Sequence, residues 1–327
     1  MNQRFHYEIV RVLGEKAGFA AGDAQVIAYS SQFVDDASHE NRFYLNGFVN
    51  QPVFRAFYNQ ESRLFNPIQT GHKDIQNLEA FDPGEQRSVL VPFHFVPDEK
   101  IEAEQKRSFL TKEDGALARS LAGRAVDELK SAAAADRTQK LIKLGIALHS
   151  YADSWAHDDF AGINYGFNKK RDCQVSILGK WKDDTRAGTF NIGHAFSRSP
   201  DLMNVNWRYK NAGDDRYVGK DNPFRFLDAA EKIFGLLASA SQSQIPFSLV
   251  KEDVRTALIF GNPREVFTDV NFDYSMTDWR NSAIRFNLLE TRSSRNHWVY
   301  DFKGDMKWFW FQLEAYNQRE FVKNNLP

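Results

Sequence analysis

One segment restricts the fold more than any other, because it is apolar around a whole helix and yet carries ionisable side chains. Residues 138–157 read TQKLIKLGIALHSYADSWAH. Apolar residues recur here on every side of a helix, and such a helix is normally buried. The chain is therefore predicted to fold around this helix, with the side chains of His149, Asp153 and His157 inside the protein.

His149, Asp153 and His157 follow one another at intervals of four residues. Each interval climbs about 6 Å and turns about 40°, so the three side chains line one side of the helix. An ionised aspartate in apolar surroundings is costly unless it is paired or bound to a cation. A buried His–Asp hydrogen-bond network, or an ion pair with an arginine from elsewhere, would satisfy Asp153. Three such groups on one face favour Zn²⁺ or a similar divalent ion instead.

One helix supplies too few ligands for a zinc site, so other segments must contribute. The candidates are His6, Asp35, Asp36, His94, His194 and Asp201. An apolar stripe in residues 5–18 turns His6 inward, and His94 stands in the apolar stretch VPFHFVPD. The periodicity of the helix predicted over 23–36 does not decide which of its two terminal aspartates faces the core. The remaining histidines stand in polar contexts and are predicted at the surface: His39, His72 and His297.

Composition excludes several classes of protein. A chain of 327 residues can bury a full hydrophobic core and needs no disulfides or structural metal ions to do so. Lys and Arg total 42 against 43 Asp and Glu, so the basic surface of a dedicated duplex-binding protein is missing. The single cysteine, Cys173, excludes an intramolecular disulfide and thiolate metal sites. The sequence shows neither a leader pattern nor 18 successive apolar residues, which predicts a soluble protein made in the cytoplasm, with signal-less secretion as an alternative.

The apolar spacing predicts an all-α fold in a single domain over 1–327. Helices are expected at 5–18, 23–36, 114–134, 138–157, 225–240, 248–259, 274–289 and 304–323. Residues 37–110 and 158–224 are polar and rich in turn residues, which predicts long irregular loops with room for a few short strands. Residues 206–327 are expected to pack as helices, and the aromatic run WFWF at 308–311 is expected in the core.

A family resemblance adds to this prediction. HSYADSWAH resembles the HxxxD core of the zinc-dependent phospholipase C superfamily, which also contains fungal single-strand-specific nucleases. The other candidates stand in that superfamily's order, and HFVPD at 94–98 resembles its HF-x-x-D motif. The chain is also similar to an uncharacterised bacterial branch with FHY, SQFVDDA and HSYADSWAH segments. The resemblance covers residues 1–205.

The resemblance implies a phospholipase C-like helical bundle around two or three zinc ions, with Asp153 bridging two of them. It assigns His149, His94 and Asp35 or Asp36 to one ion, His157 and His194 to a second, and His6 to a third. Two spacings differ from the family pattern. His157 follows Asp153 by four residues rather than six, and the carboxylate after His194, Asp201, follows by seven rather than four.

The expected function is zinc-dependent phosphodiester hydrolysis, in which a hydroxide held by the metal ions attacks phosphorus. Asp35 or Asp36 would serve as a ligand or proton acceptor. The expected substrate is a phospholipid or another phosphodiester, with a transient membrane-surface contact and no duplex nucleic acid. The alternatives are a single-strand nuclease, an HD-type phosphohydrolase that uses His157 with Asp158, and a non-catalytic, metal-stabilised interaction protein. The loop aromatics Phe160 and Phe167 fit a lipid rim, a base-stacking surface or the core.

Overall fold

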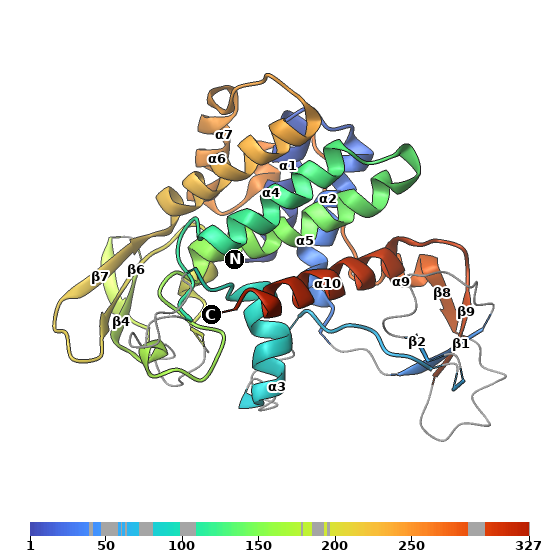
Figure 1. Ribbon diagram of the computed structural model, residues 1–327. Helices are drawn as coiled ribbons and strands as arrows, with labels where there is room; N and C mark the ends of the chain where they lie inside the picture. The colour runs from blue at the N-terminus through green and yellow to red at the C-terminus, as the bar shows by residue number, and fades with distance from the viewer. Residues whose placement is uncertain are drawn as a thin grey trace.

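The computed structural model describes residues 1–38, 42–46, 58–59, 61–62, 64–71, 81–98, 109–177, 179–184, 193–194, 197–286 and 298–326. Helix α5 (Arg137–Ala156) runs through the middle of the molecule (Figure 1). It packs against α2 (Ala21–Asp36), α4 (Ala116–Lys130) and α10 (Lys307–Asn324). Every residue from Leu144 to Ala156 is buried. The prediction of a central buried helix is therefore confirmed.

Helices α2 and α5 approach each other closely at Gly145. A Cβ atom on Gly145 would lie 1.9 Å from Ser30 Oγ and 2.3 Å from the carbonyl oxygen of Ile27. Only a glycine lets the two backbones come this near. The contact fixes where the last turn of α2, with Asp35, lies against the helix that bears His149 and Asp153.

The remaining helices surround this pair. The chain begins with a π-helical segment, η1 (Arg4–Ile9), that continues into α1 (Val10–Lys16). A short α3 (Pro83–Glu85) continues into a second π-helical segment, η5 (Gln86–His94). The others are α6 (Asn222–Ser241), α7 (Lys251–Phe260), α8 (Pro263–Val266) and α9 (Asp278–Ala283), with 3₁₀ turns at Ala134–Asp136, Gly166–Asn168, Ser199–Asp201 and Phe247–Leu249. No helix in the described ranges has the length and apolarity needed to cross a membrane.

The prediction of an all-α fold is wrong, because the described residues also form two sheets. The first has the order β2-β3-β1-β9-β8, and β1 and β9 run parallel while its other pairs are antiparallel. The second is antiparallel, with the order β5-β4-β6-β7. The two sheets lie at opposite ends of the molecule (Figure 1). Their strands are β1 (Phe43–Asn46), β2 (Tyr58–Asn59), β3 (Leu64–Phe65), β4 (Lys170–Ile177), β5 (Lys180–Asp183), β6 (Asn206–Asn211), β7 (Tyr217–Asp221), β8 (Ile284–Phe286) and β9 (Trp298–Phe302).

Short strands with distant partners explain this error. Strand β1 pairs with β9 across some 250 residues of sequence. In β6 only Trp207 and Tyr209 are buried. The other residues of NWRYKN are polar, and a segment of this composition is easily mistaken for a loop. The helix predicted over 274–289 exists only over Asp278–Ala283, because the chain then pairs with β9 as β8. The helical segment η5 was not expected, because Pro92 lies inside it.

The aromatic run at the start of α10 was predicted in the core. Trp308, Phe309 and Phe311 are fully buried, so that prediction is confirmed. They pack with Phe43 and Phe65 of the five-stranded sheet.

Candidate metal centre

The structure brings eight of the nine predicted metal ligands into one cluster. They form three groups, two of which share His149, and within each group the ligand atoms lie within 4.8 Å of one another. We call these the inner group (His6, His149, Asp153), the middle group (Asp35, His94, His149) and the outer group (His157, His194, Asp201). The ninth residue, Asp36, is in none of them.

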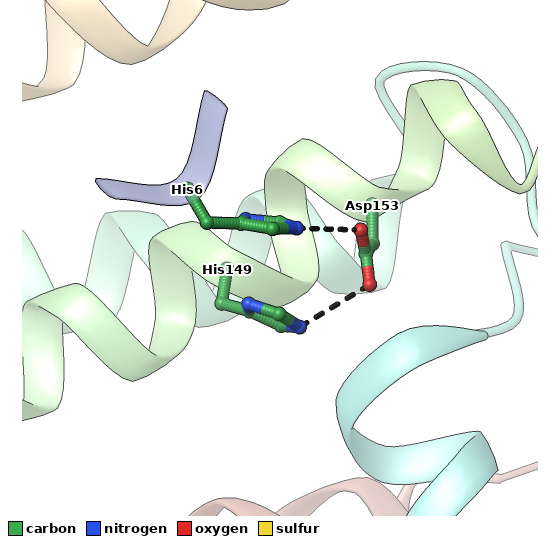
Figure 2. Close-up of side chains that lie close together, drawn as sticks. All are labelled: His6, His149 and Asp153. Atoms are coloured by element: carbon green, nitrogen blue, oxygen red, sulfur yellow. Dashed lines mark hydrogen bonds and ion pairs between the residues drawn. The ribbon is translucent and has the colours of Figure 1, made fainter. Parts of the chain in front are cut away.

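Asp153 lies at the centre of the cluster and is only 1% exposed. Its Oδ1 lies 3.1 Å from His6 Nε2, and its Oδ2 lies 3.3 Å from His149 Nε2 (Figure 2). The same Oδ2 lies 3.2 Å from His94 Nδ1. The two oxygens therefore face different sets of histidines, which is the geometry of a carboxylate that bridges two cations.

The amino group of Met1 is buried in the same place. It donates to Asp153 Oδ1 and lies 3.4 Å from Asp201 Oδ1. Burial lowers the pKa of this amino group, but Asp153, Asp201 and Asp35 outweigh it and raise the pKa to about 10. Burial raises the pKa of Asp153. The Met1 amino group and the neighbouring histidines outweigh this effect and bring the pKa of Asp153 well below its usual value. The buried, ionised Asp153 thus depends on positive charge beside it.

Three histidines are oriented by backbone carbonyl groups. His94 Nε2 lies 2.8 Å from Thr70 O, and His194 Nδ1 lies 2.8 Å from Ser197 O. His157 Nδ1 lies 2.5 Å from His94 O. A carbonyl oxygen only accepts hydrogen bonds, so the nitrogen that faces it carries the proton. In each neutral ring the other nitrogen then presents a lone pair, as in histidines that bind metal ions.

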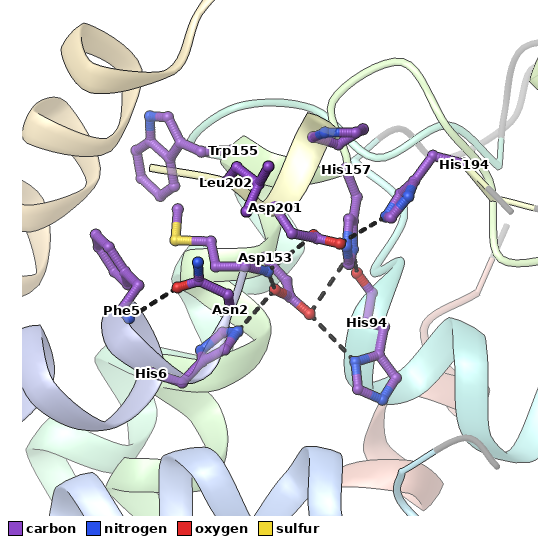
Figure 3. Close-up of polar contacts among 12 residues, drawn as sticks. Asn2, Phe5, His6, His94, Asp153, Trp155, His157, His194, Asp201 and Leu202 are labelled. Atoms are coloured by element: carbon purple, nitrogen blue, oxygen red, sulfur yellow. Dashed lines mark hydrogen bonds and ion pairs between the residues drawn. The ribbon is translucent and has the colours of Figure 1, made fainter. Parts of the chain in front are cut away.

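The second nitrogen of each ring faces a carboxylate oxygen or another imidazole nitrogen. His94 Nδ1 faces His149 Nε2 at 3.2 Å, and His157 Nε2 faces Asp201 Oδ1 at 3.4 Å. His194 Nε2 lies 3.6 Å from the other oxygen of Asp201 (Figure 3). Acceptors that face one another repel unless a proton or a cation lies between them. The donor set of imidazole and carboxylate fits zinc.

The outer group is open to solvent, as is Asp35 of the middle group at 33%. The side chain of Asp201 is 26% exposed and that of His194 is 14% exposed, whereas His6 and His149 are fully buried. The ring of Phe95 stacks on His157 with 4.2 Å between centroids. Solvent therefore reaches the cluster beside Asp201 and beside Asp35.

Asp35 and Asp36, which periodicity did not separate, point in different directions. Asp35 Oδ1 lies 3.7 Å from His149 Nε2 and 3.8 Å from His94 Nδ1. Asp36 accepts a hydrogen bond from the hydroxyl of Tyr274 and lies outside the cluster. Asp35 is therefore the candidate ligand of this pair.

One family model matches this chain. A model described as a family of unknown function, DUF6765, matches residues 1–326. The chain belongs to this family. Neither the curated proteins nor the solved structures contain a match. The resemblance of this DUF6765 chain to the phospholipase C superfamily therefore stays a prediction.

Other described residues singled out in the sequence belong to none of the three groups. Asp158 accepts a hydrogen bond from Lys220 Nζ and makes no group with His157. The loop aromatic Phe160 is buried, and its ring lies 5.7 Å from that of His194, while Phe167 is 36% exposed. His39, His72 and His297, predicted at the surface, lie outside the described residues.

Sequence reasoning missed several residues that shape the centre of this DUF6765 chain. The amino group of Met1 could have been suspected, because it precedes the inward-facing His6 by little more than one helical turn. No local signal marks Thr70 or Asn222. The fully buried Asn222 Nδ2 donates to Ser199 O and Leu202 O, both at 2.8 Å, and so holds the turn that carries Asp201.

Proposed function

We propose that this protein is a zinc-dependent phosphodiester hydrolase of the phospholipase C-like kind, which binds two or three zinc ions. The observation that carries the proposal is the orientation of His94, His157 and His194. Each ring has one nitrogen held by a backbone carbonyl and directs the other nitrogen at a carboxylate or a second imidazole. Either a proton or a metal ion must lie between such atoms, and three groups of convergent imidazoles and carboxylates favour metal ions.

The residues divide into ligand sets by their atoms. His149 Nε2, His94 Nδ1 and Asp35 Oδ1 converge with Asp153 Oδ2, and these four would hold one ion. His157, His194 and Asp201 would hold a second. His6 Nε2 and Asp153 Oδ1, beside the Met1 amino group, would hold a third. Asp153 would thus contribute to both the first and the third ion.

The chemistry requires a group that takes the proton of an attacking water. When bound, the ions neutralise the phosphoryl oxygens, lower the pKa of a water molecule and stabilise the leaving oxygen. Asp35 is the most exposed of the three carboxylates in the cluster, at 33%. Its Oδ2 accepts one long hydrogen bond, from Gln32 Nε2 at 3.5 Å, and a carboxylate oxygen has a second lone pair that could take a proton. Neutral imidazoles at the remaining positions keep the occupied site positive, which favours an anionic substrate.

The contacts of Asp158 favour this proposal over an HD-type phosphohydrolase. That mechanism needs the aspartate next to the histidine as a ligand. Asp158 is instead engaged by Lys220, and Lys112 Nζ lies 4.0 Å from its Oδ1. Removal of the Asp158 carboxylate should therefore leave metal binding intact.

An assay on the purified, zinc-loaded protein tests the proposal. The substrates are bis-p-nitrophenyl phosphate, phosphatidylcholine and single-stranded DNA. We expect hydrolysis of the first two, loss of both activities with a chelator, and their recovery when zinc returns. Asp153→Asn should be inactive, and Asp36→Asn, its matched control outside the cluster, should remain active.

The other outcomes of this assay contradict the proposal in different ways. Hydrolysis of single-stranded DNA without hydrolysis of the lipid would identify a nuclease. Full metal content without hydrolysis of any of the three substrates would identify a metal-stabilised interaction protein.

A further inference from the structure

Two ligands of the outer group have no α-helix or strand to fix them. His157 stands at the end of α5, whereas Asp201 belongs to a short 3₁₀ turn and His194 stands seven residues before it. His194 Nε2 lies 3.6 Å from Asp201 Oδ2. A metal ion held by both atoms needs this spacing to be kept, and ligands on irregular backbone depend on the hydrogen bonds behind them.

Two short turns orient these ligands. In the first, Ser197 N donates to His194 O at 2.9 Å, and the carbonyl oxygen of Ser197 lies 2.8 Å from His194 Nδ1. In the second, Asp201 N donates to Arg198 O at 3.1 Å. Each turn fixes one ligand relative to its own backbone. Neither turn by itself fixes the distance between the two ligands.

One carboxylate oxygen joins the two turns. Asp184 Oδ2 accepts hydrogen bonds from Ser197 Oγ at 2.7 Å and from Ser199 Oγ at 2.8 Å. Both serines are only 5% exposed. Hydrogen bonds to a carboxylate are short and roughly twice as strong as those between neutral groups. Asp184 thus links the turn that orients His194 to the turn that carries Asp201.

Asp184 is itself anchored to the four-stranded sheet. It follows the last residue of β5, and its backbone N donates to the carbonyl oxygen of Cys173 in β4 at 2.8 Å. The sheet therefore supplies a fixed point outside the loop. The preceding Asp183 offers a comparison, because its side chain accepts from Gln174 Nε2 at 3.0 Å and makes no hydrogen bond with the described residues of either turn.

The other contacts of the loop do not replace Asp184. Asn222 Nδ2 donates to the carbonyl oxygens of Ser199 and Leu202, and among the described loop residues it contacts none before Ser199. It therefore fixes only the turn with Asp201. A direct bond between the turns, from Ser199 N to Ser197 Oγ, is longer, at 3.3 Å.

We propose that Asp184 is a positioning residue of the outer metal site, which fixes the distance between His194 and Asp201. Its carboxylate belongs to none of the candidate ligand groups and acts through the hydroxyls of Ser197 and Ser199. Because one ion must meet both ligands at once, a loop without this link binds the ion more weakly. The proposal deepens the proposed function and rests on it, because it identifies what controls metal occupancy of the outer group.

Zinc titration of the full-length protein against a chromophoric chelator tests this role, and the site lost in Asp201→Asn identifies the outer ion. Asp184→Ala should weaken zinc binding at that site about 10–100-fold and leave the other sites unchanged. Asp184→Asn, whose amide oxygen can still accept from both hydroxyls, should stay within about fivefold of the wild type. Asp183→Ala is the matched control and should bind zinc as the wild type does. Excess zinc should restore hydrolysis of bis-p-nitrophenyl phosphate to Asp184→Ala.

A mutant cycle separates positioning from a general loss of stability. If Asp184 acts through the serines, Ser197→Ala/Ser199→Ala should weaken outer zinc binding as Asp184→Ala does, and the triple variant should weaken it no further. Urea unfolding of the metal-free variants checks that each one is folded during the titration. A merely structural role would lower the urea midpoint and leave the zinc affinity of the folded protein unchanged.

The outcomes distinguish failure of this proposal from failure of the proposed function. Wild-type zinc affinity in Asp184→Ala, losses that add up in the triple variant, or an outer group that stays empty in the wild type would overturn the positioning role alone. Full zinc binding without hydrolysis of any substrate would refute the proposed function and leave the positioning role in place. A wild type that binds no zinc at all would refute both.

Discussion

The inner and outer groups of the candidate metal centre are built in different ways. The inner group takes His149 and Asp153 from α5 and His6 from η1, and all three are buried by core packing. The outer group takes Asp201 from a 3₁₀ turn, and Asp201 is 26% exposed. Helix packing fixes the first set, whereas hydrogen bonds such as those of Asn222 fix the second. We therefore expect metal binding at the inner group to depend on the stability of the fold. The outer group should be able to lose its metal ion while the other groups keep theirs.

The largest effect is expected from Asp153→Asn. Asp153 contacts histidines of all three groups, so its loss should empty the inner and middle sites together and abolish hydrolysis. Elemental analysis of the purified variant after zinc loading measures this. Full zinc content in Asp153→Asn would refute its central position.

The second-largest effect is expected from Asp201→Asn, which should distinguish the outer group from the other two. Asp201→Asn should lose one zinc equivalent and keep the others, because Asp201 belongs to the outer group alone among the three candidate ligand groups. Hydrolysis should fall by more than about a hundredfold, since even changes behind the ligands cost 10–100-fold. Zinc titration with a chromophoric chelator counts the sites. If Asp201→Asn lost all its zinc, the outer site would not be independent.

A substitution in the core should destabilise the fold on which the inner group depends. Gly145→Ala places a Cβ against Ser30 Oγ and Ile27 O and should cost about 2–3 kcal/mol of unfolding free energy. Gly235→Ala in α6 is the matched control, because nothing lies within 4 Å of its Cβ position, and it should stabilise the protein by about 1 kcal/mol. Urea unfolding measures both. Equal stabilisation by the two alanines would contradict the close approach of α2 and α5.

Acid should destabilise the metal-free protein through its inner group. Burial, His149 and the Met1 amino group lower the pKa of His6 to about 4. The unfolded chain then binds more protons between about pH 6.5 and 4, so stability falls as the pH falls through that window. At pH 5 the loss from His6 should be about 2 kcal/mol relative to neutral pH. Urea unfolding of chelator-treated wild type and His6→Gln measures it, and an equal acid loss in both would contradict this role of His6.

The smallest effect is expected at Asp36. Asp36→Asn weakens the hydrogen bonds with Tyr274 and Gln32 and should cost about 1 kcal/mol of unfolding free energy. Zinc content should stay at the wild-type value, whereas Asp35→Asn should lose the middle ion. The two variants, measured side by side by elemental analysis, decide which aspartate is the ligand. Loss of zinc from Asp36→Asn together with full zinc content in Asp35→Asn would show that Asp36 is the ligand.

The sequence predicted most of the candidate site but not the whole fold. The spacing of His149, Asp153 and His157 places them on one side of a helix, and a buried, ionised Asp153 there needs hydrogen bonds, an ion pair or a bound cation. His6 and His94 stood out because they interrupt apolar stretches. These are local signals, and the structure confirms that the residues meet.

Features that depend on distant parts of the chain escaped prediction. The pairing of β1 with β9 leaves no trace in either segment, and β6 resembles a polar loop. The direction of Asp35 depends on how α2 packs on α5 at Gly145, which periodicity within α2 does not show. The backbone oxygens of Thr70 and Ser197 that orient His94 and His194 carry no residue-type signal at all.

Metal content tests the central claim most directly. After zinc loading and removal of excess metal, elemental analysis of the wild type should give two to three zinc ions per chain. X-ray anomalous scattering should place them beside Asp153 and Asp201. Less than one zinc ion per chain, or zinc bound away from these aspartates, would contradict the account.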